Sequence, residues 1–279
     1  MTTETQRSGA RPSGAVAVLG GGRIGEALLG GLVAAGYDAG SLLVVERDAD
    51  RAADVAERLG VTVTDAADAA ARADVLVVAV KPQDVRGVLE AVPAGRDRII
   101  VSLAAGIPTH ALEAWLPAGT PVVRVMPNTP MLVGRAMCVL SAGSHADDAA
   151  MDTAEGLLRS VGRTVRVPES QQDAATALSG SGPAYLFLVA EAMIEAGVAL
   201  GLPRPTATEL VTATVDGAGG LLSEPGNHPG LLREAVTSPG GTTAQALRVL
   251  EAHGLRAAFA DAVEACRDRS AALGATYGG

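Results

Sequence analysis

The sequence predicts an α/β fold, in which an N-terminal domain built on a parallel sheet is followed by an all-helical C-terminal domain. A glycine-rich turn at residues 20–25 joins a short apolar run to a helical pattern. Apolar runs and helical patterns then alternate up to residue 167, and strand signals fade after residue 168. The 279 residues, 48% of them hydrophobic, are enough to build two such domains.

The glycine-rich turn has the spacing of a dinucleotide site. Gly20, Gly22 and Gly25 form the pattern G-x-G-x-x-G directly after the strand predicted at 16–19. The first glycine allows the turn, the second lets the backbone approach a pyrophosphate, and the third lets the helix pack on the strand. Free amides at the helix start then hold phosphates. This context favours a Rossmann-type dinucleotide-binding domain over a glycine-rich turn without a ligand.

The second predicted strand, at 42–45, ends in the charged tip Glu46-Arg47-Asp48. An acidic residue at this place bonds the ribose hydroxyls of NAD, whereas an arginine accommodates the 2′-phosphate of NADP. Because both types are adjacent, we expect NADPH with NADH as the alternative. A solvated charged loop is the interpretation without a ligand.

The rest of this domain follows in alternation and predicts a parallel sheet with helices on both faces. Strands are expected at 61–63, 74–80, 98–103, 121–125, 137–141 and 164–167, and helices at 49–59, 66–73, 147–161 and from Thr109. Three loops follow strands at the edge where open α/β sheets bind ligands, at 81–83, 104–106 and 126–130. The small residues Ala104, Ala105 and Gly106 would let the backbone lie close to a ligand.

Lys81, in the first of these loops, is the only lysine among the 22 Lys and Arg residues. A composition that otherwise uses arginine suggests that this position needs a compact point charge, which the longer guanidinium fork does not provide. A surface lysine without a function is the alternative.

The region after Pro168 predicts helices at 171–178, 184–200, 206–222, 229–236, 243–252 and 256–273. Two interruptions, 179–183 and 237–243, place hydroxyls and glycines just before a helix with unbonded amides. A helical connector needs only a cap and a glycine. We therefore interpret the 237–243 turn as a binding element, with a simple connector as the alternative.

Composition limits the classes of partner. A net charge of −9 and a pI of about 5.0 argue against a nucleic-acid or anionic membrane surface. Cys138 and Cys266 give neither a disulfide framework nor a metal spacing, and the four histidines show no metal spacing, so no metal is expected. The two thiols indicate a reducing compartment.

No targeting segment is recognised. Residues 1–14 are polar and predict a disordered lead-in rather than a signal peptide. The most apolar long stretch, 185–202, is interrupted by Glu191 and Glu195, which favours a buried helix of a soluble protein over a membrane span. A cytoplasmic protein is expected. The domains expected from these patterns are 15–167 and 168–279.

Four blocks together resemble one family. The stretch 232–247, with Ser238-Pro239-Gly240-Gly241-Thr242-Thr243 at its centre, is similar to the signature of pyrroline-5-carboxylate reductase. The blocks 179–185, 79–82 and 126–128 are similar to that family's other blocks, in the family's order. The resemblance extends from about Ala15 to Leu273.

The resemblance implies that 1-pyrroline-5-carboxylate is reduced to proline by hydride transfer from NADPH or NADH, the last step of proline biosynthesis. It implies a homodimer through the helical domain, possibly assembled into larger rings such as a decamer. Its substrate, a small cyclic imino acid, would contact Glu169, Ser238, Gly240, Gly241, Thr242 and Thr243, of which Thr243 bonds the ring nitrogen as the catalytic residue. The cofactor would lie along Gly20, Gly22, Arg23, Ile24, Gly25, Arg47, Ala79, Val80, Lys81, Pro82, Ala104, Ala105 and Gly106.

The chemistry of these residues suits that reaction. Hydride transfer to a cyclic imine needs a positioned cofactor and a carboxylate anchor, but no strong base, since the nitrogen can arrive protonated. A β-hydroxyacid dehydrogenase is the alternative enzyme, but it would want a base such as lysine, and residues 168–279 contain none. A nucleotide-sensing protein without catalysis would not need the second hydroxyl-rich turn.

Overall fold

The structure is a computed structural model that describes residues 14–93 and 98–277. The lead-in expected at 1–14 lies outside the described residues except for Gly14. The chain divides into two compact units. The first, here the nucleotide unit, runs to Ser181 and resumes at Cys266, and the second, the helical unit, is Gly182–Ala265. Each is described by itself.

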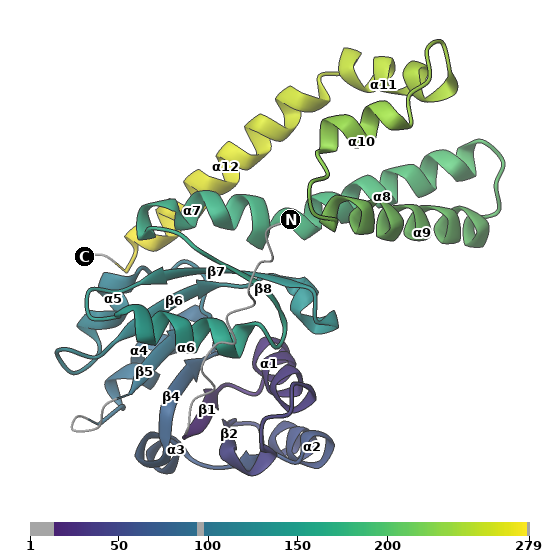
Figure 1. The fold of residues 1–279 in the computed structure, drawn as a ribbon. Helices are drawn as coiled ribbons and strands as arrows, with labels where there is room; N and C mark the ends of the chain where they lie inside the picture. Colours follow the sequence, from purple (N-terminus) through teal and green to yellow (C-terminus); the bar gives the residue numbers. More distant parts are fainter. Residues whose placement is uncertain (1–13, 94–97, 278–279) are drawn as a thin grey trace. The chain divides into compact units, whose positions relative to one another are not determined.

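One sheet forms the centre of the nucleotide unit (Figure 1). Its order is β3-β2-β1-β4-β5-β6-β7-β8, and the neighbours among β1 to β6 pair in parallel. The order reverses between β1 and β4, where such sheets place a ligand. The strands are β1 (Ala15–Leu19), β2 (Leu42–Val45), β3 (Thr62–Val63), β4 (Ala73–Val78), β5 (Ile99–Ser102), β6 (Val122–Met126), β7 (Ala136–Ala142) and β8 (Gly162–Arg166).

The last two strands differ from the rest of this predominantly parallel sheet in how they pair. β7 pairs antiparallel with β6, and β8 pairs in parallel with β7. A parallel pair needs a crossover of a dozen or more residues, usually a helix. The connection between β6 and β7 contains only the short 3₁₀ segment Thr129–Val133, so the chain turns back on itself.

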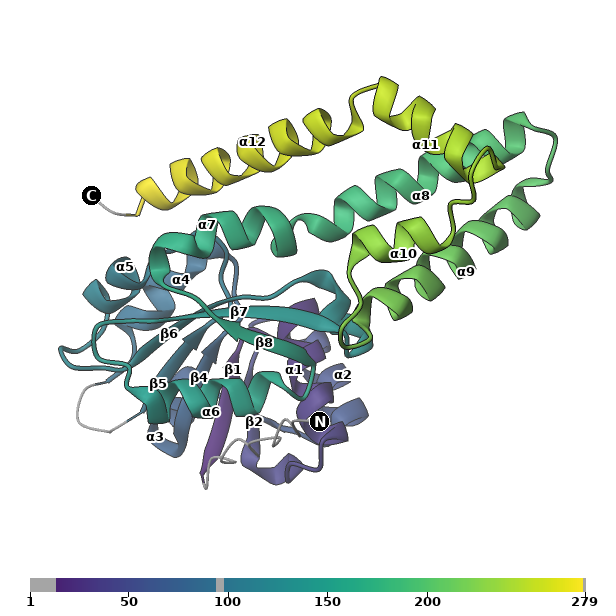
Figure 2. The same cartoon turned by 45° about the horizontal axis from the view of Figure 1, so that its top comes forward.

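Helices cover both faces of the sheet, as the sequence predicts (Figures 1 and 2). Alternate residues of β1 divide between two cores, with Val16 and Val18 on one face and Ala17 and Leu19 on the other. The first core includes α1 (Arg23–Ala34), α2 (Ala49–Leu59) and α6 (Asp148–Leu158). The second includes α3 (Ala66–Arg72), α4 (Pro82–Glu90) and α5 (Thr109–Ala114).

Two segments expected as loops are helical. Pro82 is the first residue of α4, where its missing N–H costs no hydrogen bond and its fixed φ suits the helix. Ser179–Gly180, expected in an interruption, closes a π-helical turn at Thr176–Gly180 that follows α7 (Gln172–Ala175) and leads to α8 (Gly182–Ala199). Pro183 has no N–H for the Ser179 carbonyl, and Asn128 Nδ2 donates to that carbonyl instead, at 3.2 Å.

The helical unit consists of α8, α9 (Arg204–Ser223), α10 (Pro229–Ala235), α11 (Thr242–Ala252) and the first part of α12 (Leu255–Ala275). The buried helix expected at 185–202 is wrong for a single chain, because α8 has no buried residue. Leu186, Phe187 and Leu188 are 58–67% exposed although they follow one another around the helix. Their burial therefore requires something outside the chain.

α12 crosses from the helical unit into the nucleotide unit, where it makes contacts about one turn apart. Cys266 Sγ lies 3.2 Å from Ser181 Oγ, and Ser270 Oγ donates to Asp173 Oδ1 at 2.7 Å. A Cβ placed on Gly274 would lie 3.3 Å from the carbonyl oxygen of Gly106. Beyond the helix, Tyr277 packs edge to face on Trp115 with ring centroids 6.1 Å apart. The residues after the helical unit thus complete the nucleotide unit.

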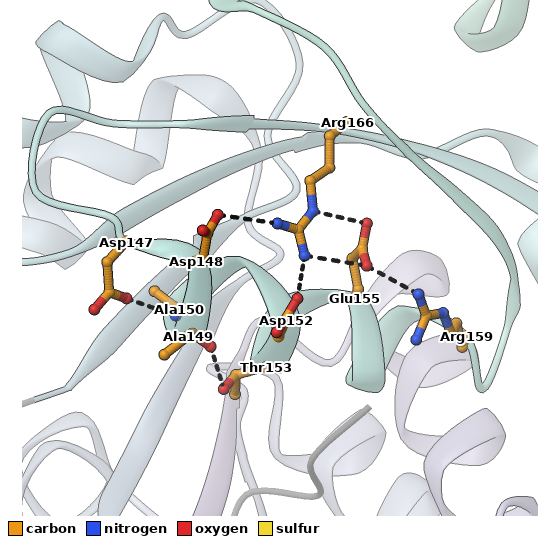
Figure 3. Close-up of polar contacts among 9 residues, drawn as sticks. All are labelled: Asp147, Asp148, Ala149, Ala150, Asp152, Thr153, Glu155, Arg159 and Arg166. Atoms are coloured by element: carbon orange, nitrogen blue, oxygen red, sulfur yellow. Dashed lines mark hydrogen bonds and ion pairs between the residues drawn. The ribbon is translucent and has the colours of Figure 1, made fainter. Parts of the chain in front are cut away.

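The edge strand β8 is tied to α6 by a network of charges. Figure 3 shows Arg166 among three carboxylates of α6, and its Nε donates to Glu155 Oε1 at 3.1 Å. Asp152 accepts from Nη2, and Asp148 lies 3.5 Å from Nη1. Glu155 also accepts from Arg159 at 2.9 Å. The pKa of Arg166 is raised because it bonds to Glu155 and Asp152. These acidic residues therefore pair with arginines and hold β8 against α6.

Candidate functional site

The predicted cofactor residues follow four neighbouring strands of the nucleotide unit. β2, β1, β4 and β5 are adjacent and parallel, so their carboxyl ends share one edge of the sheet. The first residues of three loops continue the strand pairing: the amides of Gly20, Ala79 and Leu103 donate to the carbonyls of Val45, Leu19 and Val78 at 2.8–2.9 Å. The loops therefore start from a rigid frame.

The glycine turn has the geometry of its fingerprint. Gly20 has φ +111°, and a Cβ there would lie 2.9 Å from the Ala79 carbonyl. A Cβ on Gly25 would lie 2.0 Å from the Gly20 oxygen, so only glycine lets α1 approach the turn this closely. Gly22 has open space around it, and no side chain of the described residues caps α1 there. The amides of Arg23, Ile24 and Gly25 have no carbonyl on their own helix to bond, which leaves them for phosphates.

The tip of β2 places its two charged residues differently. Glu46 folds back onto the glycine turn: Oε2 accepts from the Gly21 amide at 2.9 Å, and Oε1 accepts from the Asp48 amide at 3.0 Å. Burial raises its pKa, but these amides and the Arg51 guanidinium outweigh burial and hold the pKa below 4.5. The Arg47 side chain is 84% exposed and pairs with Asp84 of α4 at 3.4 Å.

The loops after β4 and β5 line the same edge. Ala79 and Val80 are half-buried, and Lys81 is exposed at the N-cap of α4, directly before Pro82. In the next loop Ala104 is buried, Ala105 is exposed and Gly106 has φ +77°, which favours glycine. Backbone groups and one cation are therefore the main polar features that these loops offer.

The predicted substrate turn lies in the helical unit, between α10 and α11. The Gly241 amide donates to the Ser238 carbonyl at 3.0 Å, with Pro239 and Gly240 between them and Gly240 at φ +69°. Proline followed by a glycine of positive φ is typical of a type II turn. The Thr237 hydroxyl donates to the Arg233 carbonyl at 2.5 Å, so its hydrogen is not available to a ligand.

The turn delivers the chain to the start of α11. Gly241 is the N-cap and contributes no side-chain cap, and Thr242 is the first residue of α11. Thr243 is half-buried and Thr242 is exposed. Amides of this first turn point away from the helix without an intrahelical acceptor. The turn therefore offers hydroxyls and N–H donors to an anion.

Glu169 belongs to the nucleotide unit, whereas this turn belongs to the helical unit. Its Oε1 accepts from Arg124 Nη1 at 2.5 Å and from the Thr109 amide at 3.3 Å. Sequence reasoning missed Arg124 and Thr109. A lone arginine in the apolar strand Val122–Met126 was the available signal, because a buried guanidinium needs a carboxylate.

The described residues hold no group of three His, Cys, Asp or Glu side chains arranged for a metal. Both cysteines are free thiols. Burial raises the pKa of Cys138 to about 12, so this thiol is unreactive at neutral pH.

Comparison with known proteins covers nearly the whole chain. Residues 169–273 match the family described as pyrroline-5-carboxylate reductase dimerisation, and residues 15–106 match the family described as NADP oxidoreductase coenzyme F420-dependent. A pyrroline-5-carboxylate reductase of Corynebacterium melassecola is 47% identical over 93% of this chain and 98% of its own length. That of Pseudomonas aeruginosa is 41% identical over 94% and 98%.

Solved structures agree with these relatives. A pyrroline-5-carboxylate reductase from Coxiella burnetii superposes with a TM-score of 0.89 and 39% identity, covering 93% of this chain and 98% of that one. A Plasmodium falciparum pyrroline carboxylate reductase with NADP bound has a TM-score of 0.83 and 28% identity, covering 95% and 100%. With the glycine turn, the serine-proline turn and these similarities in place, the chain belongs to the pyrroline-5-carboxylate reductase family.

Proposed function

We propose that this chain reduces 1-pyrroline-5-carboxylate to proline. The observation that carries the proposal is the Ser238–Thr243 turn, whose hydroxyls and unbonded amides suit an anionic, nitrogen-containing substrate. A hydride adds to the imine carbon, the C=N bond becomes a single bond, and the nitrogen carries the proton of the product. Consumption of NADPH with pyrroline-5-carboxylate tests this reaction, and cofactor binding without turnover would refute it.

The nicotinamide cofactor fits the edge formed by the four loops. NADPH supplies the hydride when it is bound. The glycine turn and first amides of α1 hold its phosphates, while Ala79–Pro82 and Ala104–Gly106 provide backbone along its length. The residue assignments rest on the adjacency of these loops and on the openness of Gly22.

NADPH is the cofactor that the β2 tip favours. The Glu46 carboxylate is committed to the Gly21 and Asp48 amides and is paired with Arg51 at 3.3 Å, which weakens its repulsion of a 2′-phosphate. Arg47 is free to exchange its weak exposed pair with Asp84 for that phosphate. NADH is the alternative if Glu46 instead accepts from the ribose hydroxyls.

At the substrate, positioning does most of the work. The amides of Gly240–Thr243 and the Ser238 hydroxyl hold the carboxylate, and Thr243 holds the ring nitrogen so that the imine carbon can face the cofactor. No side chain from Thr237 to Thr243 is ionisable, so the proton comes from solvent or arrives with an iminium substrate. The Thr243 hydroxyl stabilises the nitrogen as the hydride arrives.

A β-hydroxyacid dehydrogenase is the second enzyme to exclude. Alcohol oxidation calls for a general base, and residues 168–279 contain no lysine. Turnover should therefore be measured with both substrate classes, a cyclic imino acid with NADPH and a hydroxyacid with NADP⁺. Activity on the hydroxyacid alone would overturn the proposed reaction.

The protein assembles as a homo-oligomer, and we propose a dimer through the helical unit. The dimerisation family matches this region, and Leu186, Phe187 and Leu188 expose apolar area that a second copy would cover. Rings of dimers such as a decamer are the larger assembly implied by the family resemblance. Light scattering at micromolar concentration tests both, and a monomer would refute them.

We propose that the enzyme is located in the cytoplasm. One stretch, Glu169–Ala199, is long and apolar enough to cross a membrane, and none of its most apolar part is buried, but it contains Glu191 and Glu195. A dimer interface accounts for the same exposed apolar surface, and the dimerisation match spans the stretch. Cell fractionation tests the assignment, which recovery in the membrane fraction would contradict.

A further inference from the structure

The loop between β5 and α5, residues 103–109, is fastened at three places within the nucleotide unit. At its start, the Leu103 amide bonds to the Val78 carbonyl of β4 at 2.9 Å. In its middle, Gly106 lies against the end of α12, where a Cβ on Gly274 would make a tight contact of 3.3 Å with the Gly106 carbonyl oxygen. At its end, the Thr109 amide donates to Glu169. Glu169 provides the one side-chain contact among these three; the other two involve backbone atoms.

Glu169 is itself held in one orientation by Arg124. The Arg124 side chain is 5% exposed, and its Nη1 lies 2.5 Å from the carboxylate oxygen that receives the Thr109 amide. Arg124 stands beside Ser102 of β5 and Ser141 of β7 in the sheet register, on the face that α7 partly covers through Gln172. The buried Arg124 guanidinium binds its partly exposed carboxylate partner strongly, because the arginine itself cannot return to water. The carboxylate is therefore a fixed point.

The second oxygen, Glu169 Oε2, is buried and has no hydrogen-bond partner among the described residues. An unsatisfied buried acceptor is unfavourable for stability. The position of this carboxylate therefore leaves one of its two oxygens without a hydrogen bond. Its one engaged oxygen joins β6 to the end of the loop, which is the geometry of a positioning contact.

We propose that Glu169 is a positioning residue for the cofactor, acting through the loop 103–109. This inference rests on the proposed function, which assigns Ala104–Gly106 to the cofactor. When the Thr109 amide loses its acceptor, the loop end relaxes toward solvent and the backbone of Ala104–Gly106 no longer keeps its distance from the cofactor. Displacements of about 1 Å in a supporting element weaken binding or rate by up to about 10².

The test compares Glu169→Leu with Glu169→Gln. Leucine removes the acceptor, whereas glutamine keeps an oxygen for Thr109 and Arg124. Glu169→Leu should raise the KM and Kd for NADPH about tenfold, equivalent to about 1.4 kcal/mol, and leave kcat at saturating cofactor within about twofold. Glu169→Gln should restore most of the affinity. Because leucine leaves Arg124 unpaired, the double variant Arg124→Met/Glu169→Leu is measured as well, and it should show the same weakened affinity.

Two controls separate this role from a general loss of structure. Asp147→Ala removes another capping carboxylate of the nucleotide unit, which accepts from the Ala150 amide at 2.9 Å, and should leave NADPH affinity unchanged. Ala105→Glu places bulk and negative charge directly in the exposed loop and should strongly weaken the binding of NADPH. Fluorescence of Trp115, the only tryptophan and the residue that ends α5, verifies that each variant is folded.

The outcomes are distinct. Weaker NADPH binding in both Ala105→Glu and the folded Glu169 variants, with rescue by glutamine, supports the proposal. Weaker binding in Ala105→Glu alone overturns the positioning role and leaves the loop as a cofactor contact. Unchanged binding in all of them overturns the loop assignment and the positioning role together. Lower thermal stability with unchanged NADPH affinity would reduce Glu169 to a structural ion pair.

Discussion

Gly25 offers the sharpest test of the cofactor site, because its substitution changes one distance, that between α1 and the Gly20 carbonyl oxygen. An alanine Cβ at this position would lie 2.0 Å from the Gly20 carbonyl oxygen, whereas ordinary contact begins at 3.4 Å. The start of α1 must therefore retreat from the turn by about 1.4 Å. Because the opposing atom belongs to the backbone, no side chain can give way instead.

That displacement affects both stability and binding. Overpacking of this kind costs about 1–3 kcal/mol of folding free energy. The amides of Arg23, Ile24 and Gly25 also move with the helix, so they no longer surround the phosphates. A misplacement of about 1 Å can lower a rate by about 10². We expect Gly25→Ala to weaken NADPH by about 10² or more, measured by titration of NADPH fluorescence, and to lower the melting temperature.

Gly30→Ala, on the same helix, is the matched control. Its Cβ would meet Leu59 Cδ2 at 3.8 Å, which is ordinary contact. Alanine in a helix interior is favoured over glycine by about 1 kcal/mol, so this variant should be more stable than the parent and bind NADPH equally well. Wild-type NADPH affinity in a folded Gly25→Ala protein would refute the role assigned to the close approach of helix and turn.

Three further predictions concern the other residues. Thr243→Val should lower turnover by about 10² to 10³ while NADPH binding is nearly unchanged, and Thr242→Val should do less; equal turnover in Thr243→Val would remove that hydroxyl from the mechanism. Arg47→Ala should raise the KM for NADPH but hardly that for NADH, and equal effects on both would contradict the 2′-phosphate contact. Because Glu46 has a lowered pKa in the folded protein, it contributes stability above about pH 4.5 that is lost as the pH falls through its folded pKa. The stability difference between the parent and Glu46→Gln, measured by thermal unfolding, should therefore shrink between neutral pH and pH about 4; a constant difference would show that the carboxylate's charge is irrelevant.

Much of the fold could be predicted because local patterns specify it. The helix predicted at 49–59 and the strand at 42–45 have those bounds in the structure, since Asp48 caps the helix and Gly60 ends it in the left-handed region. The geometry at Gly20 and the turn at Pro239-Gly240 also follow from residue type alone, because few residues other than glycine accept a positive φ.

The remainder depends on partners distant in sequence. Hydrophobic alternation predicts that 137–141 is a strand but carries no information on its direction, which the short connection from β6 decides. The pairing of Arg124 with Glu169 joins residues 45 apart, and the apolar strand around Arg124 indicates that it needs a carboxylate but not which one. The exposure of α8 could not be foreseen from a single chain either, since an apolar helix has the same sequence whether its own chain or a second copy covers it.

The crossing of α12 has a consequence for the order in which the protein is made. Trp115 and Gly106 leave the ribosome more than 160 residues before Tyr277 and Gly274, which pack on them. The eight strands can pair before then, yet this corner of the nucleotide unit stays open until the whole helical unit has been synthesised. A nascent chain therefore cannot finish its cofactor domain before it already carries the surface through which it meets a second copy.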